Sequence, residues 1–120
     1  SAAPAVGEEG DRTGAAKAQV SISNEKFQKM TSAIVYYINR ENNKGIDAVK
    51  WGDVTLWYLD THEQELETEE ELDRELDIVN KVIRRLLAEG STLMYIGSQD
   101  DKDEDDRLIA LHPSVDPASF

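Results

Sequence analysis

Carboxylates are the residues in this sequence with the most capacity for chemistry, and they gather in one segment. Residues 60–77, here called the acidic segment, hold ten Asp and Glu side chains against a single basic residue, Arg74. Paired carboxylates serve as general acids and bases in catalysis, but they need a cleft, and a chain of 120 residues offers little room for one. A run of like charge is more often a solvated face. The segment therefore favours binding over catalysis.

Other reactive side chains are few. The sequence has no cysteine, which excludes a disulfide, a thiolate nucleophile and a cysteine zinc site and fits a reducing compartment. His62, on the polar side of a helix beside Glu63, and His112, before Pro113 at a strand end, are both expected at the surface. No phosphate-binding glycine loop, zinc-protease helix or nucleophile turn is present. The sequence predicts a domain that is not an enzyme and uses no cofactor.

The spacing of three aspartates suggests one metal site, a calcium-binding loop. Asp101, Asp103 and Asp105 match positions 1, 3 and 5 of an EF-hand loop. The glycine required at position 6 is replaced by Asp106, and the bidentate glutamate required at position 12 is replaced by His112. The sequence therefore predicts a solvated acidic loop and no metal site.

Leucines within the acidic segment give it a second property. Leu66 stands among glutamates, and Leu72 and Leu76 fall in the first turns of the following helix, where the core need not reach. Leu76 fits equally well as the end of the core stripe. Exposed leucines with an acidic rim suit a basic amphipathic helix, which would be held by apolar contact and steered by charge. The candidate partner-binding residues are Glu63, Leu66, Glu69, Glu70, Leu72 and Leu76.

The first half of the chain predicts an arm and two helices. Residues 1–22 are rich in Ala, Gly, Glu and Ser and are expected to be a disordered arm, with one domain over residues 23–120. A helix should begin at Ser23 or Asn24 and end before Gly45, and it carries an apolar stripe at helical spacing. A second helix is expected over about residues 51–64, after a short extended segment.

A third helix and a hairpin complete the expected fold. Thr68 and Glu71 form a capping box at the helix start, and Gly90 marks its end. Two strands, residues 92–96 and 108–111, are joined by a polar wing loop, residues 98–107. This order predicts an α+β winged helix, a three-helix helix-turn-helix core followed by a C-terminal β-hairpin wing. The expected core is Phe27, Ile34, Ile38, Val54, Trp57, Tyr58, Val79, Val82, Ile83 and Leu86, closed by Met94, Ile96 and Ile109.

Nucleic-acid binding is the usual role of a winged helix, and the charge opposes it here. The net charge is −12, the third helix opens with Glu69, Glu70 and Glu71, and the tip of the wing loop, residues 100–106, carries six carboxylates against Lys102. Such surfaces repel phosphates. Only a basic patch remains, formed by Lys81, Arg84 and Arg85. With no long apolar run and no signal sequence, we also expect no membrane contact, and we expect the isolated domain to be monomeric.

Five stretches of the sequence together resemble a known family. They are WYL at residues 57–59, EQELETEEEL at 63–72, NKVIRRL at 80–86, MTSAIV at 30–35 and LIALHP at 108–113. They resemble, over about residues 23–116, the C-terminal domain of subunit six of the eukaryotic minichromosome maintenance complex, the replicative helicase. The wing loop is more acidic than that family pattern, and Leu76 is apolar where the pattern differs.

The resemblance implies a winged helix that lies beyond the ATPase module of a helicase subunit, in a nuclear hetero-hexamer with other subunits. It implies docking of the licensing factor that escorts the helicase onto origins, through that factor's C-terminal region, which we expect to be a basic amphipathic helix. Carried over by position, the binding residues are Glu63, Glu69 and Leu72. Two alternatives stay open: a DNA-contacting accessory domain centred on the basic patch, and an intramolecular module packed on the ATPase domain.

Overall fold

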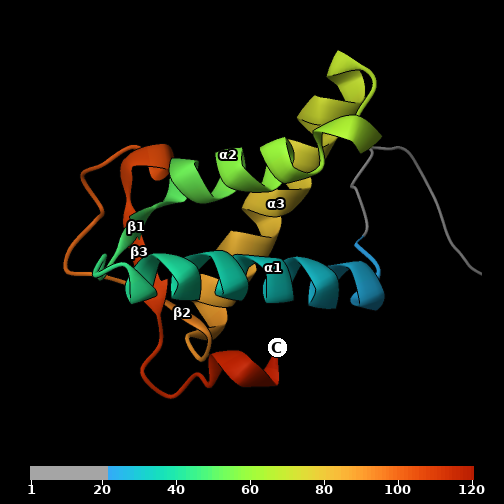
Figure 1. Ribbon diagram of the computed structural model, residues 1–120. Helices are drawn as coiled ribbons and strands as arrows, with labels where there is room; N and C mark the ends of the chain where they lie inside the picture. Colours follow the sequence, from blue (N-terminus) through green and yellow to red (C-terminus); the bar gives the residue numbers. More distant parts are fainter. Residues whose placement is uncertain (1–21) are drawn as a thin grey trace, which may run out of the picture.

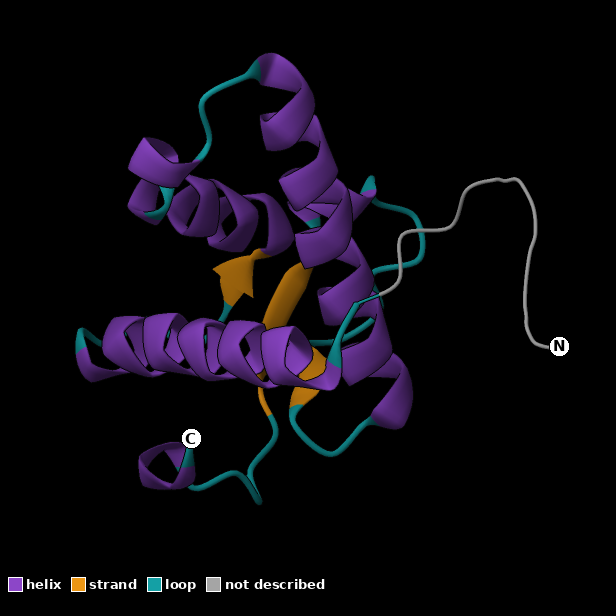
Figure 2. Ribbon diagram, turned by 90° about the vertical axis from the view of Figure 1, so that its right-hand side faces the viewer, coloured by secondary structure: helices purple, strands orange, loops and turns teal. Residues whose placement is uncertain are grey.

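A computed structural model describes residues 22–120, in which three α-helices gather around a small antiparallel sheet (Figures 1 and 2). The predicted arm, residues 1–22, lies outside the described residues except for Ile22. The α-helices and strands are α1 (Asn24–Asn43), β1 (Val49–Lys50), α2 (Trp51–Thr61), α3 (Glu69–Glu89), β2 (Leu93–Tyr95) and β3 (Leu108–Leu111). The predicted α+β winged helix is confirmed. None of the helices between residues 22 and 120 is long and apolar enough to cross a membrane.

Local signals fix the ends of α1 and α3 where the sequence predicts them. The Ser23 hydroxyl accepts a hydrogen bond from the backbone N–H of Lys26 (3.1 Å), which caps α1. Thr68 and Glu71 form the predicted capping box at the start of α3. Gly90 ends α3 in the left-handed conformation (φ 73°), which a residue without a Cβ adopts at no steric cost.

The second helix is shorter than predicted. It ends at Thr61 instead of Gln64, and a separate 3₁₀ helix, η1 (Glu63–Glu65), follows it. The His62 ring Nδ1 lies 2.9 Å from the carbonyl oxygen of Tyr58, and the Thr61 hydroxyl donates to the carbonyl of Trp57 (2.8 Å). These side chains satisfy the last carbonyls of α2. The carboxylates of η1 would be unfavourable at the negative end of a continuing helix dipole.

The wing has three strands where the sequence predicted two. The order is β1-β3-β2, and β1 pairs with β3 through Val49 opposite Ile109. The short extended segment expected before α2 therefore becomes an edge of the sheet. A second 3₁₀ helix, η2 (Glu104–Asp106), lies in the wing loop next to α2, and a third, η3 (Pro117–Ser119), lies beside α1 (Figures 1 and 2).

The predicted face of β2 was wrong by one residue. Leu93 is fully buried, whereas Ile96, predicted to close the core, is 40% exposed and Met94 is half-buried. Successive side chains of a strand point to opposite faces, so a shift of one residue exchanges the two sets. The pairing of Leu93 with Leu111 sets the face that meets the helices.

The helical part of the predicted core is confirmed apart from Trp57, which is half-buried. Trp51, the largest fully buried side chain, was not among the predicted core residues. Its indole N–H donates to the Asn80 side-chain oxygen of α3 (2.8 Å), which ties the first turn of α2 to the middle of α3. This arrangement leaves the first two turns of α3 beyond the core. The join between α2 and α3 consequently projects from the body of the domain (Figure 1).

Candidate protein-docking site

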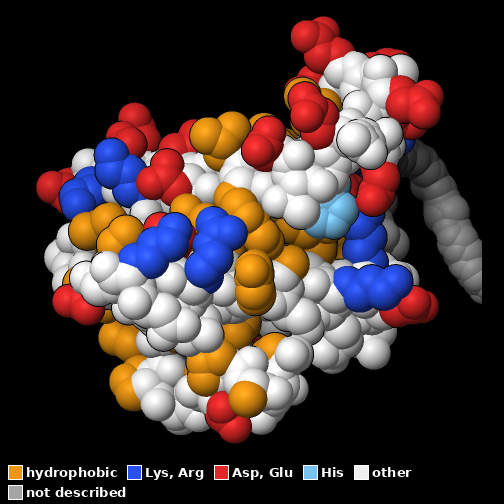
Figure 3. Space-filling model, viewed as in Figure 1, with side chains coloured by type: hydrophobic (Ala, Val, Ile, Leu, Met, Phe, Trp, Pro, Cys, Tyr) orange, Lys and Arg blue, Asp and Glu red, His pale blue; other side chains and the backbone are white. Residues whose placement is uncertain are grey.

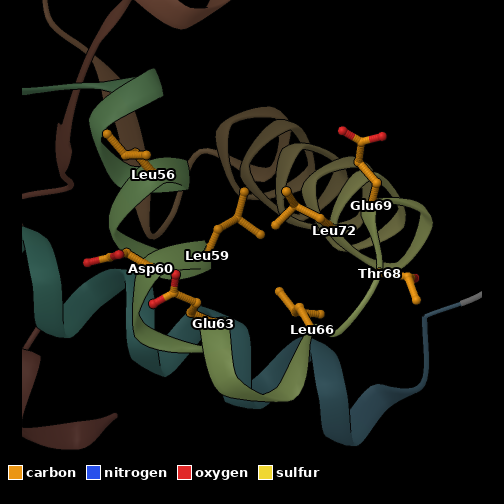
Figure 4. Close-up of a pocket in the computed structure, with 8 residues that line it drawn as sticks. All are labelled: Leu56, Leu59, Asp60, Glu63, Leu66, Thr68, Glu69 and Leu72. Atoms are coloured by element: carbon orange, nitrogen blue, oxygen red, sulfur yellow. The ribbon is translucent and has the colours of Figure 1, made fainter.

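A hollow of about 490 Å³ lies at the projecting join, and we call it the α2–α3 groove (Figure 4). Four of its lining residues are leucines, and three are carboxylates. The full lining is Leu56, Leu59, Asp60, Glu63, Leu66, Thr68, Glu69 and Leu72. An open, mainly apolar hollow on a projecting part of a small domain is a feature of interaction surfaces.

The four leucines that line the groove come from three parts of the join. Leu56 and Leu59 belong to α2, Leu66 follows η1, and Leu72 lies in the first turn of α3. Figure 4 shows Leu59, Leu66 and Leu72 pointing toward one another, with Leu56 farther along α2. Leu56 is 67% exposed and Leu72 is 39% exposed, so both keep apolar surface available to a partner. The groove is therefore an apolar strip that the core leaves uncovered.

Carboxylates border this strip on both sides. Asp60 and Glu63 lie on one side and Glu69 on the other (Figure 4). All three are exposed, and no lysine or arginine between residues 22 and 120 forms an ion pair with them. Acidic side chains also crowd the outer surface of the join (Figure 3). The rim is thus negative and uncompensated by the described part of the domain.

The capping box fixes the α3 half of the groove. The Thr68 hydroxyl accepts from the backbone N–H of Glu71 (3.1 Å). The Glu71 carboxylate accepts from the backbone N–H groups of Glu67 (2.8 Å) and Thr68 (3.3 Å). The carboxylate of Glu71 is therefore occupied within the turn. Glu69 and Leu72, on the same first turn, are held in a defined position.

Contacts behind the groove hold α2 and α3 against α1. Lys26 forms an ion pair with Glu75 (2.9 Å), which joins the first turn of α1 to α3. Tyr58 is buried beside this pair, and its pKa is raised to about 12, first by burial and then by the negative charge of Glu75. The His62 ring stacks on Tyr58 with 4.2 Å between ring centroids. The end of α2 is thereby anchored.

The structure brings together four of the six candidate residues named from the sequence. Glu63, Leu66, Glu69 and Leu72 line the α2–α3 groove. Glu70 is exposed on the first turn of α3 but does not line the groove, and Leu76 is half-buried and also outside it. The role of all six in binding stays a prediction.

Sequence reasoning missed the α2 side of the groove. Leu56, Leu59 and Asp60 complete the lining, and none was singled out. The sequence contains a signal for Leu56, because Val54 and Tyr58 define the inward stripe of α2. Leu56 therefore falls on the opposite, polar face. A leucine on the polar face of an amphipathic helix is a mark of an uncovered apolar surface.

The basic patch proves to be paired with acids. Arg84 donates from both Nε and Nη2 to the carboxylate of Glu104 in η2, each at 2.8 Å. The hydrogen bond from Arg84 lowers the pKa of Glu104, and the same bond raises the pKa of Arg84. The acidic wing therefore binds the middle of the helix that would approach DNA.

Its other two cations also have partners. Lys81 pairs with Asp77 (3.2 Å), and Arg85 pairs with Glu89 (3.2 Å). The Arg85 guanidinium also lies 4.1 Å from the centre of the Phe27 ring, at cation–π distance. Each cation of the basic patch is therefore partly neutralised by a neighbouring carboxylate.

Among the described residues, no group of three or more His, Asp or Glu side chains is placed to hold a metal ion. This includes the aspartates of the wing loop, residues 98–107.

Comparison with known proteins gives a consistent result. Residues 18–117 match the family described as the MCM6 C-terminal winged-helix domain. The chain is 30% identical over 104 residues to the DNA replication licensing factor mcm6 of Schizosaccharomyces pombe, covering 83% of this chain and 12% of that protein. It is 24% identical over 117 residues to DNA replication licensing factor Mcm6 of Anopheles gambiae, covering 87% of this chain and 14% of that protein. No solved structure gives a significant match. The chain spans about one eighth of these relatives.

Proposed function

Because the chain belongs to the family of MCM6 C-terminal winged-helix domains, we propose that it docks the licensing factor that escorts the replicative helicase onto origins. The partner element would be a basic amphipathic helix from that factor's C-terminal region. The observation that carries the proposal is the α2–α3 groove, where exposed leucines lie between two acidic rims with which no lysine or arginine of residues 22–120 forms an ion pair. This pattern is complementary to a helix with an apolar stripe flanked by lysine and arginine.

The two kinds of contact have different roles in this proposal. The apolar stripe of the partner would lie on Leu56, Leu59, Leu66 and Leu72 and would provide most of the affinity. Exposed ion pairs with the rim contribute only about 0–1 kcal/mol each, but they speed association and set orientation. The domain performs no chemical step of its own. In the cell it would act in the nucleus, within a helicase hetero-hexamer, during helicase loading.

The projecting position of the groove also supports docking. The join stands clear of the sheet, so a helix can lie along it without disturbing the core (Figure 1). The anchoring contacts of Tyr58, His62 and Glu75 keep the join in place before a partner arrives. A preformed surface of this kind loses little entropy on binding.

Leu72→Ala tests the proposal with isothermal titration calorimetry against the partner's C-terminal region. Leu72 is 39% exposed, so its truncation leaves the core intact while removing the centre of the groove. We expect a loss of affinity of about tenfold or more, as for a central apolar contact. Ile96→Ala is the matched control, because Ile96 is equally exposed (40%) but lies on the wing. Equal affinities for wild type and a folded Leu72→Ala variant would place binding elsewhere.

DNA contact through the basic patch is the second candidate, and its three residues all have acidic partners in the structure. No feature of the described residues favours it over docking. The remaining alternative is that this domain packs on the ATPase domain of the same subunit. That contact would involve a segment outside this chain.

A further inference from the structure

A second hollow adjoins the α2–α3 groove on the other side of α2. This α1–α2 hollow has a volume of about 520 Å³. It is lined by Tyr37, Arg40, Glu41, Lys44, Asp53, Leu56, Trp57 and Asp60. Leu56 and Asp60 line both hollows, so the two surfaces are continuous across the exposed ridge of α2.

An aromatic shelf forms the floor and edge of the second hollow. The Trp57 ring stacks on Tyr37 with 5.0 Å between centroids and lies 6.2 Å from Tyr36, which is 58% exposed. Figure 3 shows hydrophobic side chains gathered between α1 and α2, beside basic ones. Of the six large apolar side chains that are exposed in the described residues, three (Tyr36, Leu56 and Leu72) border this continuous surface. That concentration marks an interaction surface instead of scattered exposure.

The open charge of the hollow is negative. Both of its cations contact Glu41, whose carboxylate lies 3.4 Å from Arg40 Nε and 3.1 Å from Lys44 Nζ. The Arg40 guanidinium also lies 5.4 Å from the centre of the Tyr37 ring and 5.9 Å from that of the Trp57 ring. Asp53 and Asp60 are exposed, and within residues 22–120 no cation forms an ion pair with either. The Trp57 and Tyr37 rings therefore already lie beside a cation of the domain itself. The two exposed carboxylates suit a lysine or an arginine of a partner, whose N–H groups can reach an acid while its stem packs on the apolar surface.

We propose that the docking surface continues past Leu56 over the α1–α2 hollow, where the same basic partner packs on Tyr36 and Trp57 and places a cationic side chain beside Asp53 and Asp60. This inference rests on the proposed docking function and extends it. Both hollows present the same two features, an apolar surface and unpaired carboxylates, and they share a wall. One basic segment can therefore satisfy both, with its helix in the α2–α3 groove and the adjoining chain on the shelf.

The two tryptophans of the domain provide a direct reporter. Trp51 is fully buried and bonded to Asn80, whereas Trp57 is half-buried in the hollow. A change in intrinsic fluorescence on binding therefore reports on Trp57. The partner's C-terminal region, with any tryptophan replaced by phenylalanine, is titrated into wild type, Tyr36→Ala, Asp53→Asn, Leu72→Ala and the control Ile96→Ala. We expect a fluorescence change with wild type and Ile96→Ala, and an affinity about fivefold lower for Tyr36→Ala and about threefold lower for Asp53→Asn.

Each outcome separates the extension from the docking function. If Leu72→Ala weakens binding while Tyr36→Ala and Asp53→Asn bind like wild type and Trp57 fluorescence stays constant, the partner is confined to the α2–α3 groove and the extension is wrong. If wild type shows no binding by calorimetry or fluorescence, the docking function fails and the extension fails with it. Asp53→Asn changes one exposed carboxylate only, so it keeps the test decisive should Tyr36→Ala fold poorly.

Discussion

On the first turn of α3, Glu69 and Leu72 stand three residues apart and face the same groove. They would contribute different kinds of energy to a complex. Burial of Leu72 removes apolar surface from water, at roughly 25 cal/mol per Å². Glu69 is exposed, so an ion pair there is screened by salt and is worth at most about 1 kcal/mol. Affinity should therefore follow the leucines, and the association rate should follow the carboxylates.

Glu69→Gln is expected to lower affinity for the partner about two- to fivefold and to flatten its dependence on salt, because one exposed ion pair is lost. Titrations at several salt concentrations measure both effects. Glu70→Gln is the matched control, since it changes the net charge equally at the neighbouring position but lies outside the groove. If both variants lose affinity to the same extent, the domain attracts its partner through its overall negative field and the specific rim is not needed.

Helix α3 positions half of the groove, and its capping box fixes the position of its first turn. Thr68→Ala removes the hydroxyl that accepts from Glu71, so we expect the free energy of unfolding to fall by about 1 kcal/mol. Partner affinity should fall as well, because Leu72 and Glu69 lie on the loosened turn. Thr68→Ser keeps the hydroxyl and should restore both properties. Urea unfolding with a parallel titration checks this; unchanged stability in Thr68→Ala would show that the cap is dispensable.

The wing is tied to α3 by Glu104 and Arg84, and this contact depends on pH. Arg84 lowers the pKa of Glu104, so the pair stabilises the fold at pH values above the ordinary range of a glutamate. The stabilisation is lost as the pH falls through the lowered pKa. Because the side chains are 49% and 34% exposed, we expect at most about 1 kcal/mol at pH 7. Urea unfolding of wild type and Glu104→Gln should differ at pH 7 and converge in acid. A difference that persists in acid would mean that the carboxylate charge is not its source.

How far the sequence predicts these elements depends on how local their signals are. The ends of α1 and α3 follow from Ser23, Thr68 and Gly90, each of which acts within one turn of its own helix. The pairing of β1 with β3 joins segments far apart in the chain. The sequence of a short apolar stretch does not indicate which strand it will pair with. The face of β2 depends on that same sheet, which is why Met94 was expected where Leu93 lies.

The candidate site shows the same division. Its α3 side was predictable because six glutamates and two leucines fall within one continuous stretch, residues 63–72. Its α2 side depends on how α2 crosses α3, so Leu56 and Leu59 enter the groove only through the tertiary fold. Trp51 was read as the start of a helix, and its burial against Asn80 likewise depends on packing between helices.

At the scale of the whole molecule, charge decides which of the usual surfaces of a winged helix is available. The net charge of the chain is −12, and each cation of the basic patch pairs with an acid, one of them in the wing itself. A phosphate backbone approaching α3 and the wing would meet this negative field, and the cations there are already partly neutralised. The surface that remains available to a partner is the α2–α3 groove, whose acidic rim attracts cations. The domain thus keeps the winged-helix architecture while its charge favours a basic protein partner.

We propose that this domain binds a basic protein helix at the α2–α3 groove and does not bind DNA. Backbone amide NMR of the isotope-labelled chain can distinguish the two ligands, with the partner's C-terminal region and a short DNA duplex titrated in parallel. We expect shifts clustered at residues 56–72 with the protein, extending to Tyr36, and none with DNA. Shifts along the second half of α3 and the wing with DNA, and none with the protein, would contradict it.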